Sequence, residues 1–224
     1  MESATDPGGL AGRSERIGPD GPAYDAVVFD LLTALIDSWS LWNAVAGSAD
    51  DGLRWRKEYL KLTYGAGPYR PYEAIVAEAA AAAGLPPSRA VALAGRWDEL
   101  APWPEVRQVF DAIAGRAKLA VVTNCSVALG RRAAALVFDR FDVVVTAEEA
   151  GFYKPRREPY AMTLARLGTS PARTLFVAGS ASDVPGAAAL GMPVFWHNRI
   201  GLPAAADAAP DFHERTLRRL TDLV

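Results

Sequence analysis

Short apolar runs alternate with helix-like segments along most of the chain. The first run, Ala26-Val27-Val28-Phe29, is typical of a strand buried on both faces, and it ends at Asp30. Four later runs have the same character, at residues 119–122, 143–145, 174–177 and 193–196. Apolar residues at helical spacing fill intervals between them, at residues 104–113, 127–137 and 159–167. This alternation predicts an α/β fold with a doubly wound parallel sheet covered by helices on both faces.

Residues 38–103 interrupt the alternation. They contain helical segments around residues 53–63, 72–83 and 89–100 but no convincing strand. An insertion directly after the first strand hangs over the carboxyl end of that strand, where open α/β sheets place their ligands. We therefore predict a Rossmann-like core formed by residues 23–37 and 104–224, with a small helical cap at residues 38–103. Ordinary packing of these helices on the sheet is the alternative.

Composition narrows the class of protein. Of the 224 residues, 50% are hydrophobic and 22% are charged, which excludes a wholly disordered chain. Residues 1–22 are the exception, because they are rich in Gly, Pro, Ser and charge, and we expect a disordered tail there. The net charge of −2 provides no basic surface for nucleic acid or an anionic membrane.

Cysteine usage and hydropathy bear on location. The single cysteine, Cys125, excludes a disulfide framework and suits a reducing compartment. The N-terminus has no signal-peptide h-region, and no apolar run reaches the roughly 18 residues of a membrane span. These observations predict a cytoplasmic protein that binds neither nucleic acid nor membrane.

Polar side chains follow several of the predicted strands. Asp30 ends the first strand, and the pair Thr123-Asn124 ends the second. Lys154 precedes Pro155, and Asp183 lies in the loop after the strand at 174–177. A lone Asp in such a place is commonly a helix cap or a turn former. Because parallel strands bring their carboxyl ends to one edge, however, we expect these side chains to converge.

These four motifs, in this order, resemble those of the haloacid dehalogenase superfamily, and the resemblance runs from about Tyr24 to the C-terminus. It implies that Asp30 attacks an electrophilic carbon or phosphorus and forms a covalent intermediate. Lys154 is then expected to keep Asp30 ionised, and Asp183 to orient Lys154 or to activate water. Thr123, together with the backbone amides of Leu31 and Leu32, is expected to hold the anionic group of the substrate.

The position two residues after the nucleophile separates branches of the superfamily. Phosphatases have a second aspartate there, whereas this chain has Leu32, which transfers no proton. The pair Trp55-Arg56 and the later Tyr160 resemble the L-2-haloacid dehalogenase branch. This resemblance implies that a short 2-haloacid is hydrolysed through an aspartyl ester without a metal or other cofactor. Arg56 and Asn124 are then expected to stabilise the halide.

Some positions depart from that pattern. Thr33-Ala34 replaces Gly-Thr, Ala178 and Ser180 replace Ser and Asn, and Ser182 replaces Trp. The expected substrate contacts of this branch, including Tyr160 and Ser180, therefore surround an altered site. Two alternatives stay open. One is a Mg²⁺-dependent phosphatase with the metal held by Asp30, the Leu32 carbonyl and Asp183, and the other is a non-catalytic member that binds a small acid.

The expected partner in the favoured interpretation is a small-molecule carboxylate. A homodimer is expected only by analogy with the branch that the chain resembles.

Overall fold

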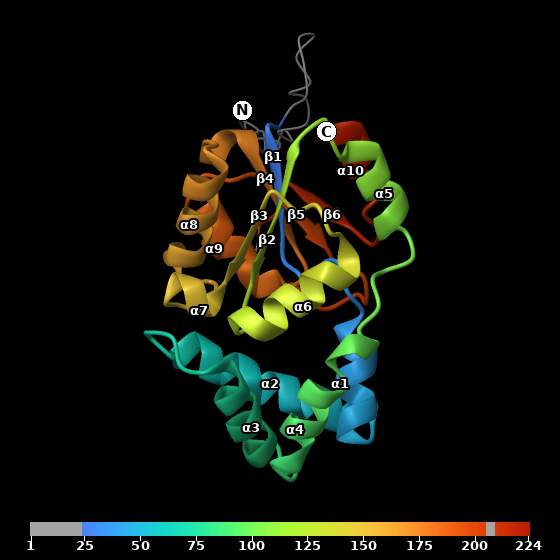
Figure 1. The fold of residues 1–224 in the computed structure, drawn as a ribbon, viewed down its shortest axis with the longest axis vertical. Coiled ribbons are helices and arrows are strands. Elements are labelled where there is room, and N and C mark those ends of the chain that lie inside the picture. Colours follow the sequence, from blue (N-terminus) through green and yellow to red (C-terminus); the bar gives the residue numbers. More distant parts are fainter. Residues whose placement is uncertain (1–23, 205–208) are drawn as a thin grey trace, which may run out of the picture.

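The structure is a computed structural model that describes residues 24–204 and 209–224 (Figure 1). A six-stranded sheet with the order β3-β2-β1-β4-β5-β6 forms its centre, and all neighbouring strands are parallel. The strands are β1 (Ala26–Phe29), β2 (Lys118–Thr123), β3 (Val143–Thr146), β4 (Thr174–Ala178), β5 (Val194–His197) and β6 (Phe212–Glu214). The predicted doubly wound parallel sheet is thereby confirmed, and the expected tail at residues 1–22 lies outside the described residues.

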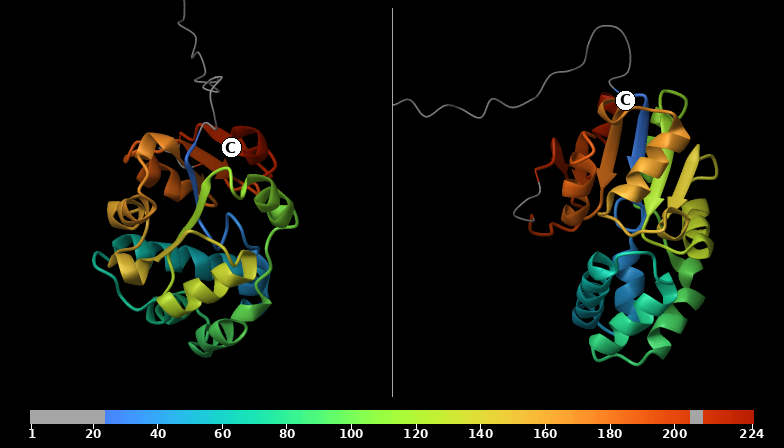
Figure 2. Two further views of the ribbon diagram at one scale, coloured as in Figure 1. Left: turned by 45° about the horizontal axis from the view of Figure 1, so that its top comes forward. Right: turned by 90° about the vertical axis from the view of Figure 1, so that its left-hand side faces the viewer.

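Strand β1 is apolar throughout because both of its faces are covered. Val27 and Phe29 belong to one buried cluster, and Ala26 and Val28 belong to another on the opposite side. Helices cover the two faces of the sheet (Figure 2). They are α5 (Val106–Ile113), α6 (Val127–Val137) and α10 (Leu220–Leu223) on the first cluster, and α8 (Arg157–Leu167) and α9 (Val184–Ala188) on the second.

The last strand, β6, is absent from the sequence prediction. It has only three residues, and its partly exposed side chains give it no apolar run. Its register pairs Trp196 with His213, whose rings stack with centroids 4.3 Å apart. Tertiary contact with β5 therefore accounts for this edge strand better than local sequence does.

A group of helices lies beyond the carboxyl ends of the strands rather than on a face of the sheet (Figure 1). It consists of α1 (Ser38–Ala46), α2 (Ala49–Gly65), α3 (Tyr72–Ala82), α4 (Ser88–Gly95) and the short 3₁₀ helix η1 (Trp97–Glu99). We call these residues, 38–99, the helical segment. Helix α1 was not predicted, and the expected helix at 89–100 is interrupted at Arg96.

Two antiparallel connections join the helical segment to the sheet. The Asp37 amide donates to the Ala101 carbonyl at 2.9 Å, and the Trp103 amide donates to the Leu35 carbonyl at 2.9 Å. Asp37 also begins α1, since its carboxylate accepts a hydrogen bond from the Ser40 amide at 3.1 Å. This pairing places the helical segment directly over the end of β1. None of the described helices is long and apolar enough to cross a membrane.

The remaining short helices connect the larger elements. They are α7 (Ala147–Ala150), η2 (Pro171–Arg173) and η3 (Ala181–Asp183). Helix α7 follows β3 and begins with a capping box between Thr146 and Glu149. It leads to the turn that carries Lys154.

Candidate active site

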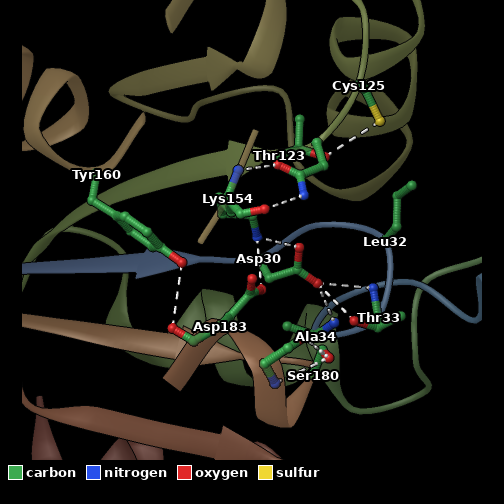
Figure 3. Close-up of polar contacts among 12 residues, drawn as sticks. Asp30, Leu32, Thr33, Ala34, Thr123, Cys125, Lys154, Tyr160, Ser180 and Asp183 are labelled. Carbon is green, nitrogen blue, oxygen red and sulfur yellow. Dashed lines mark hydrogen bonds and ion pairs between the residues drawn. The ribbon is translucent and has the colours of Figure 1, made fainter. Parts of the chain in front are cut away.

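The carboxyl ends of three adjacent strands bring the predicted polar residues together. Asp30 follows β1, Thr123 ends β2 and Asp183 follows β4, and β1 lies between β2 and β4 in the sheet. Lys154 reaches the same place from the turn after α7 (Figure 3). These four side chains therefore converge at one edge of the sheet, as expected.

Lys154 lies between the two carboxylates. Its Nζ is 2.7 Å from Oδ1 of Asp30 and 2.8 Å from Oδ2 of Asp183, and only 1% of its side chain is exposed. Burial lowers the pKa of a lysine, but the charges of Asp183 and Asp30 outweigh burial and raise the pKa of Lys154. The lysine therefore stays protonated at neutral pH.

The two carboxylates differ in their electrostatics. Burial alone raises the pKa of Asp30, but the Lys154 charge, the Lys154 hydrogen bond and the donors on Thr33 together lower it. Burial, with a smaller contribution from the negative charge of Asp30, raises the pKa of Asp183. Asp30 is consequently the ionised member, and Asp183 is the better proton acceptor.

A turn after β1 holds the second oxygen of Asp30. Oδ2 accepts hydrogen bonds from the Thr33 amide at 3.1 Å, the Thr33 hydroxyl at 2.8 Å and the Ala34 amide at 3.2 Å (Figure 3). Thr33 therefore supplies a hydroxyl to the Asp30 carboxylate although Thr33-Ala34 departs from the Gly-Thr of the family pattern. Gly179 allows this turn to pack on the loop after β4, because a Cβ there would lie 2.2 Å from the Ala34 amide nitrogen.

His197 supports the same turn from the sheet side. Its Nδ1 lies 2.8 Å from the Ala34 carbonyl oxygen, and its side chain is fully buried. Burial is the largest effect on this histidine and lowers its pKa, so the ring is neutral at physiological pH. The His197 side chain supports this turn and does not line the cavity between the strand ends and the helical segment.

A cavity of about 110 Å³ lies between the strand ends and the helical segment. On the sheet side it is lined by Asp30, Leu32, Thr123, Asn124, Lys154 and Asp183. On the other side aromatic residues predominate, namely Trp39, Trp42, Tyr59, Tyr64 and Tyr72. An engineered cavity of about 150 Å³ holds benzene, so this space suits a ligand of only a few heavy atoms.

Arg56 lies in the wall formed by the helical segment. Its guanidinium carbon is 4.1 Å from the ring centroid of Trp39 and 4.8 Å from that of Trp42. One terminal nitrogen donates to the Ser38 hydroxyl at 2.7 Å, and that hydroxyl donates to the Leu32 carbonyl. Burial lowers the pKa of Arg56 to about 10, which leaves it charged at neutral pH. The site therefore contains a second cation besides Lys154.

Asn124 and Thr123 both line the cavity. Asn124 fixes the backbone of Lys154, because its Oδ1 accepts from the Lys154 amide at 2.7 Å and its Nδ2 donates to the Lys154 carbonyl at 3.1 Å. The Thr123 hydroxyl donates to the buried thiol of Cys125 at 3.3 Å. Burial raises the pKa of that thiol to about 12, so Cys125 is not a nucleophile at neutral pH.

The backbone after Asp30 provides further donors. The side chain of Leu31 is buried in the core, whereas Leu32 lines the cavity. Within the described residues, neither the Leu31 amide nor the Leu32 amide has a hydrogen-bond acceptor. Adjacent free amides of this kind suit an anion.

Of the two further expected substrate contacts, Tyr160 and Ser180, only Ser180 lies at the cavity. The Tyr160 side chain is not among the residues that line the cavity, and its contact with substrate stays a prediction. Helix α8 buries this ring against Phe176, with centroids 5.2 Å apart, and its hydroxyl donates to the Asp183 carbonyl at 3.3 Å. Ser180 does line the cavity, and its Oγ lies 2.7 Å from Oγ of Ser182.

Several cavity residues were not singled out from the sequence. Trp39 and Trp42 are three residues apart on α1, and Tyr59 lies on α2 three residues after Arg56, which the sequence had already indicated, so each pair faces one side of its helix. Tyr59 also donates to the Asn124 carbonyl at 3.0 Å, which links α2 to the end of β2. The helical spacing of these aromatic residues was the available signal.

The donor set does not fit the Mg²⁺ site of the phosphatase alternative. The ammonium group of Lys154 takes the position between Asp30 and Asp183, and the Leu32 carbonyl already accepts the Ser38 hydroxyl. Within the part of the chain that the structure describes, no cluster of three or more His, Cys, Asp or Glu side chains could hold a metal ion.

Comparisons with known proteins agree with this geometry. A family model described as haloacid dehalogenase-like hydrolase matches residues 24–191. A similar protein, (S)-2-haloacid dehalogenase of Xanthobacter autotrophicus, is 29% identical over 201 residues, covering 81% of this chain and 78% of the relative. Haloacetate dehalogenase H-2 of Moraxella sp. (strain B) is 27% identical over 218 residues, with 89% and 97% covered.

A solved structure is similar over most of its length. It is the L-2-haloacid dehalogenase from Xanthobacter autotrophicus with chloropropionic acid covalently bound. The superposition has a TM-score of 0.80 at 25% identity and covers 89% of this chain and 98% of that one.

Proposed function

The chain belongs to the haloacid dehalogenase-like hydrolases, and from this premise we propose that it hydrolyses the carbon–halogen bond of a short 2-haloacid through an ester to Asp30. The observation that carries the proposal is the surroundings of Asp30. Lys154 supplies a fixed cation there, and Leu32 stands where proton transfer to a leaving oxygen would be needed. A halide leaves without a proton, so this set of side chains suits it. The names of the similar proteins point to the same substrate class.

The first step is an in-line displacement. An oxygen of Asp30 forms a bond to the carbon that carries the halogen, and the halide departs with the electron pair of the broken bond. Lys154 and the donors on Thr33 and Ala34 keep the carboxylate ionised and aimed before the attack. The displacement inverts the configuration at that carbon.

The second step releases the product. Water attacks the acyl carbon of the ester and regenerates the Asp30 carboxylate, and the hydroxy acid leaves. Asp183 accepts the proton of the water, since its pKa is raised by burial and it lies 2.8 Å from Lys154. Haloacid and water thus give hydroxy acid, halide and one proton.

Binding of the substrate follows from the donors in the cavity. The amides of Leu31 and Leu32 and the backbone amide after Thr123 hold the substrate carboxylate, and the Thr123 hydroxyl joins them by turning away from the Cys125 thiol. Arg56 and Asn124 stabilise the departing halide, and Ser180 borders the water site. Residues 38–103 act as a cap that closes the site and sets the size of the substrate.

Three expectations extend this proposal. The substrate is a small carboxylate, the protein resides in the cytoplasm, and two copies form a homodimer. The first is supported by the free amides beside Asp30 and the cation Arg56. The other two rest on cysteine usage and on analogy, and they stay predictions.

Halide release tests the function directly. L-2-chloropropionate and bromoacetate are incubated with the protein in the presence of a chelator, and Asp30→Asn is the control. We expect release by the wild type and none by the variant. Phosphoester hydrolysis that needs Mg²⁺ would favour the phosphatase alternative. Thermal stabilisation by haloacids without turnover would favour a binding protein.

A further inference from the structure

The cavity opens to solvent at one end. Tyr64, on α2, is 43% exposed, and Ser180, Ser182 and Leu202 are partly exposed, although all four line the cavity. The two carboxylates and the lysine on the sheet side of the cavity are buried instead. A small molecule can therefore reach the open end from solvent. We call this end the mouth of the cavity, and it is formed by Leu60, Tyr64, Ser180, Ser182 and Leu202.

Three hydroxyl groups gather at the mouth from two sides. Ser180 and Ser182 belong to the loop after β4, and their Oγ atoms lie 2.7 Å apart. Tyr64 comes from the helical segment, and its hydroxyl interacts with both serine hydroxyls. Burial raises the pKa of Tyr64 to about 12, so its hydroxyl keeps its proton at neutral pH. The three groups therefore form a polar cluster without charge.

This cluster has more acceptor capacity than donor capacity. Each hydroxyl has one proton and two lone pairs, so three hydroxyls that bond to one another commit their protons and keep free lone pairs. The five residues of the mouth are all uncharged. Among the nearby charges, the Asp183 carboxylate acts on Tyr64 more strongly than the Lys154 ammonium does. The complementary group is therefore a neutral donor such as a hydroxyl, and a carboxylate is disfavoured.

The mouth faces the one part of the substrate that the proposed reaction leaves unassigned. The carbon that Asp30 attacks carries a carboxylate, a halogen, a hydrogen and one side group. In the proposed function the carboxylate is held near Thr123, and the halide lies at Arg56 and Asn124. Ser180 lies on the opposite side of Asp30 from Thr123 (Figure 3). The side group of the substrate is therefore directed toward Ser180 and the mouth.

We propose that the mouth binds a hydroxyl group on the carbon next to the reacting one, so that 2-halo-3-hydroxy acids are the preferred substrates. The inference rests on the proposed dehalogenation and names its substrate class. The substrate hydroxyl donates to the cluster of Tyr64, Ser180 and Ser182 and takes no part in the bond changes. 2-Chloro-3-hydroxypropionate and water give glycerate, chloride and a proton. A site that hydrogen-bonds a substrate hydroxyl discriminates against the analogue that lacks it.

A ratio of rates for two substrates of the same shape tests this inference. We compare kcat/KM for 2-chloro-3-hydroxypropionate with that for 2-chlorobutyrate, in which a methyl group replaces the hydroxyl, at the same configuration of the reacting carbon. The proteins are the wild type, Tyr64→Phe, Ser182→Ala and the double variant, and each substitution removes only an oxygen atom. Tyr153→Phe and Ser170→Ala are the matched controls, because neither side chain lines the cavity.

The wild type should favour the hydroxy acid by about tenfold. The double variant should lower this ratio to about one, and the controls should keep the wild-type ratio. A general structural defect lowers both rates together, so an unchanged ratio in the double variant overturns the proposal. A wild-type ratio near one overturns it as well. So does a preference for 2-chlorosuccinate over both substrates, because the mouth would then recognise a negative group.

Binding of the reaction products separates this inference from the proposed function. Calorimetry compares glycerate with 2-hydroxybutyrate on the wild type and on the double variant, and neither measurement needs turnover. Tighter binding of glycerate that the double variant loses supports the mouth even if no haloacid is hydrolysed. Turnover of haloacids without a preference in rate or in binding leaves the dehalogenation standing and contradicts the inference. Binding of neither product, in a protein that hydrolyses no haloacid, contradicts both.

Discussion

Replacing Lys154 by Met tests the electrostatics on which the site depends. The substitution keeps much of the side-chain volume but removes the ammonium group that lies 2.7 Å from Asp30 and 2.8 Å from Asp183. Both carboxylates are almost fully buried, so both lose the cation that they share. Breaking a buried ion pair in this way costs about 3–5 kcal/mol of the free energy of unfolding.

The loss depends on pH in a defined direction. In the wild type the folded-state pKa of Asp30 is lowered, so this group contributes stability above its unfolded pKa and loses it as the pH falls. Without Lys154, burial is the dominant effect on both carboxyls and raises their folded-state pKa values. Stability of the variant is then present at low pH and is lost as the pH rises through those values.

Urea unfolding at pH 5 and pH 8 measures this difference. We expect the penalty of Lys154→Met to be about 3–5 kcal/mol at pH 8 and to shrink toward pH 5. The slope is at most about 1.4 kcal/mol per pH unit for each proton taken up. The matched control is Lys61→Met, because Lys61 is largely exposed and should change stability by less than about 0.5 kcal/mol. An equal penalty at both pH values, or dehalogenation at the wild-type rate, would refute the reasoning.

Other predictions concern the turn that holds Asp30 and the second cation. Thr33→Val removes the hydroxyl 2.8 Å from Asp30 and should lower kcat/KM about tenfold or more, whereas Thr33→Ser should retain most of the rate in a steady-state assay. Gly179→Ala places a Cβ against the same turn, and calorimetry should record a loss of about 1–3 kcal/mol. Arg56→Gln should lower kcat about 10²-fold while thermal unfolding shifts little; an unchanged kcat would remove Arg56 from the site. Turnover should fall as the pH drops through the lowered pKa of Asp30, which a pH–rate profile checks.

The sequence predicted the parts of the fold that local patterns determine. Strand β1 consists of four apolar residues because both of its faces are buried. Its neighbours β2 and β4 are largely apolar for the same reason. Helix α1 was not predicted, although Trp39 and Trp42 lie three residues apart in it. Strand β6 depends on pairing with β5, which no local pattern indicates.

Site residues that directly follow the ends of strands could be predicted from the sequence. Residues whose contacts depend on how helices pack against the sheet could not. Asp30, Thr123 and Asp183 converge because their strands are neighbours. Tyr160 has the expected sequence spacing, yet α8 directs its ring to Phe176 rather than into the cavity.

The central claim is that Asp30 is the nucleophile, and isotope labelling during one turnover tests it most directly. Excess enzyme is mixed with L-2-chloropropionate in water enriched in ¹⁸O, and the lactate and the peptide containing Asp30 are analysed by mass spectrometry. The mechanism predicts unlabelled oxygen in the new hydroxyl of lactate and one ¹⁸O atom in the Asp30 carboxylate. Label in the lactate hydroxyl with none in that peptide would mean that water attacks the substrate directly, and it would contradict the proposed ester.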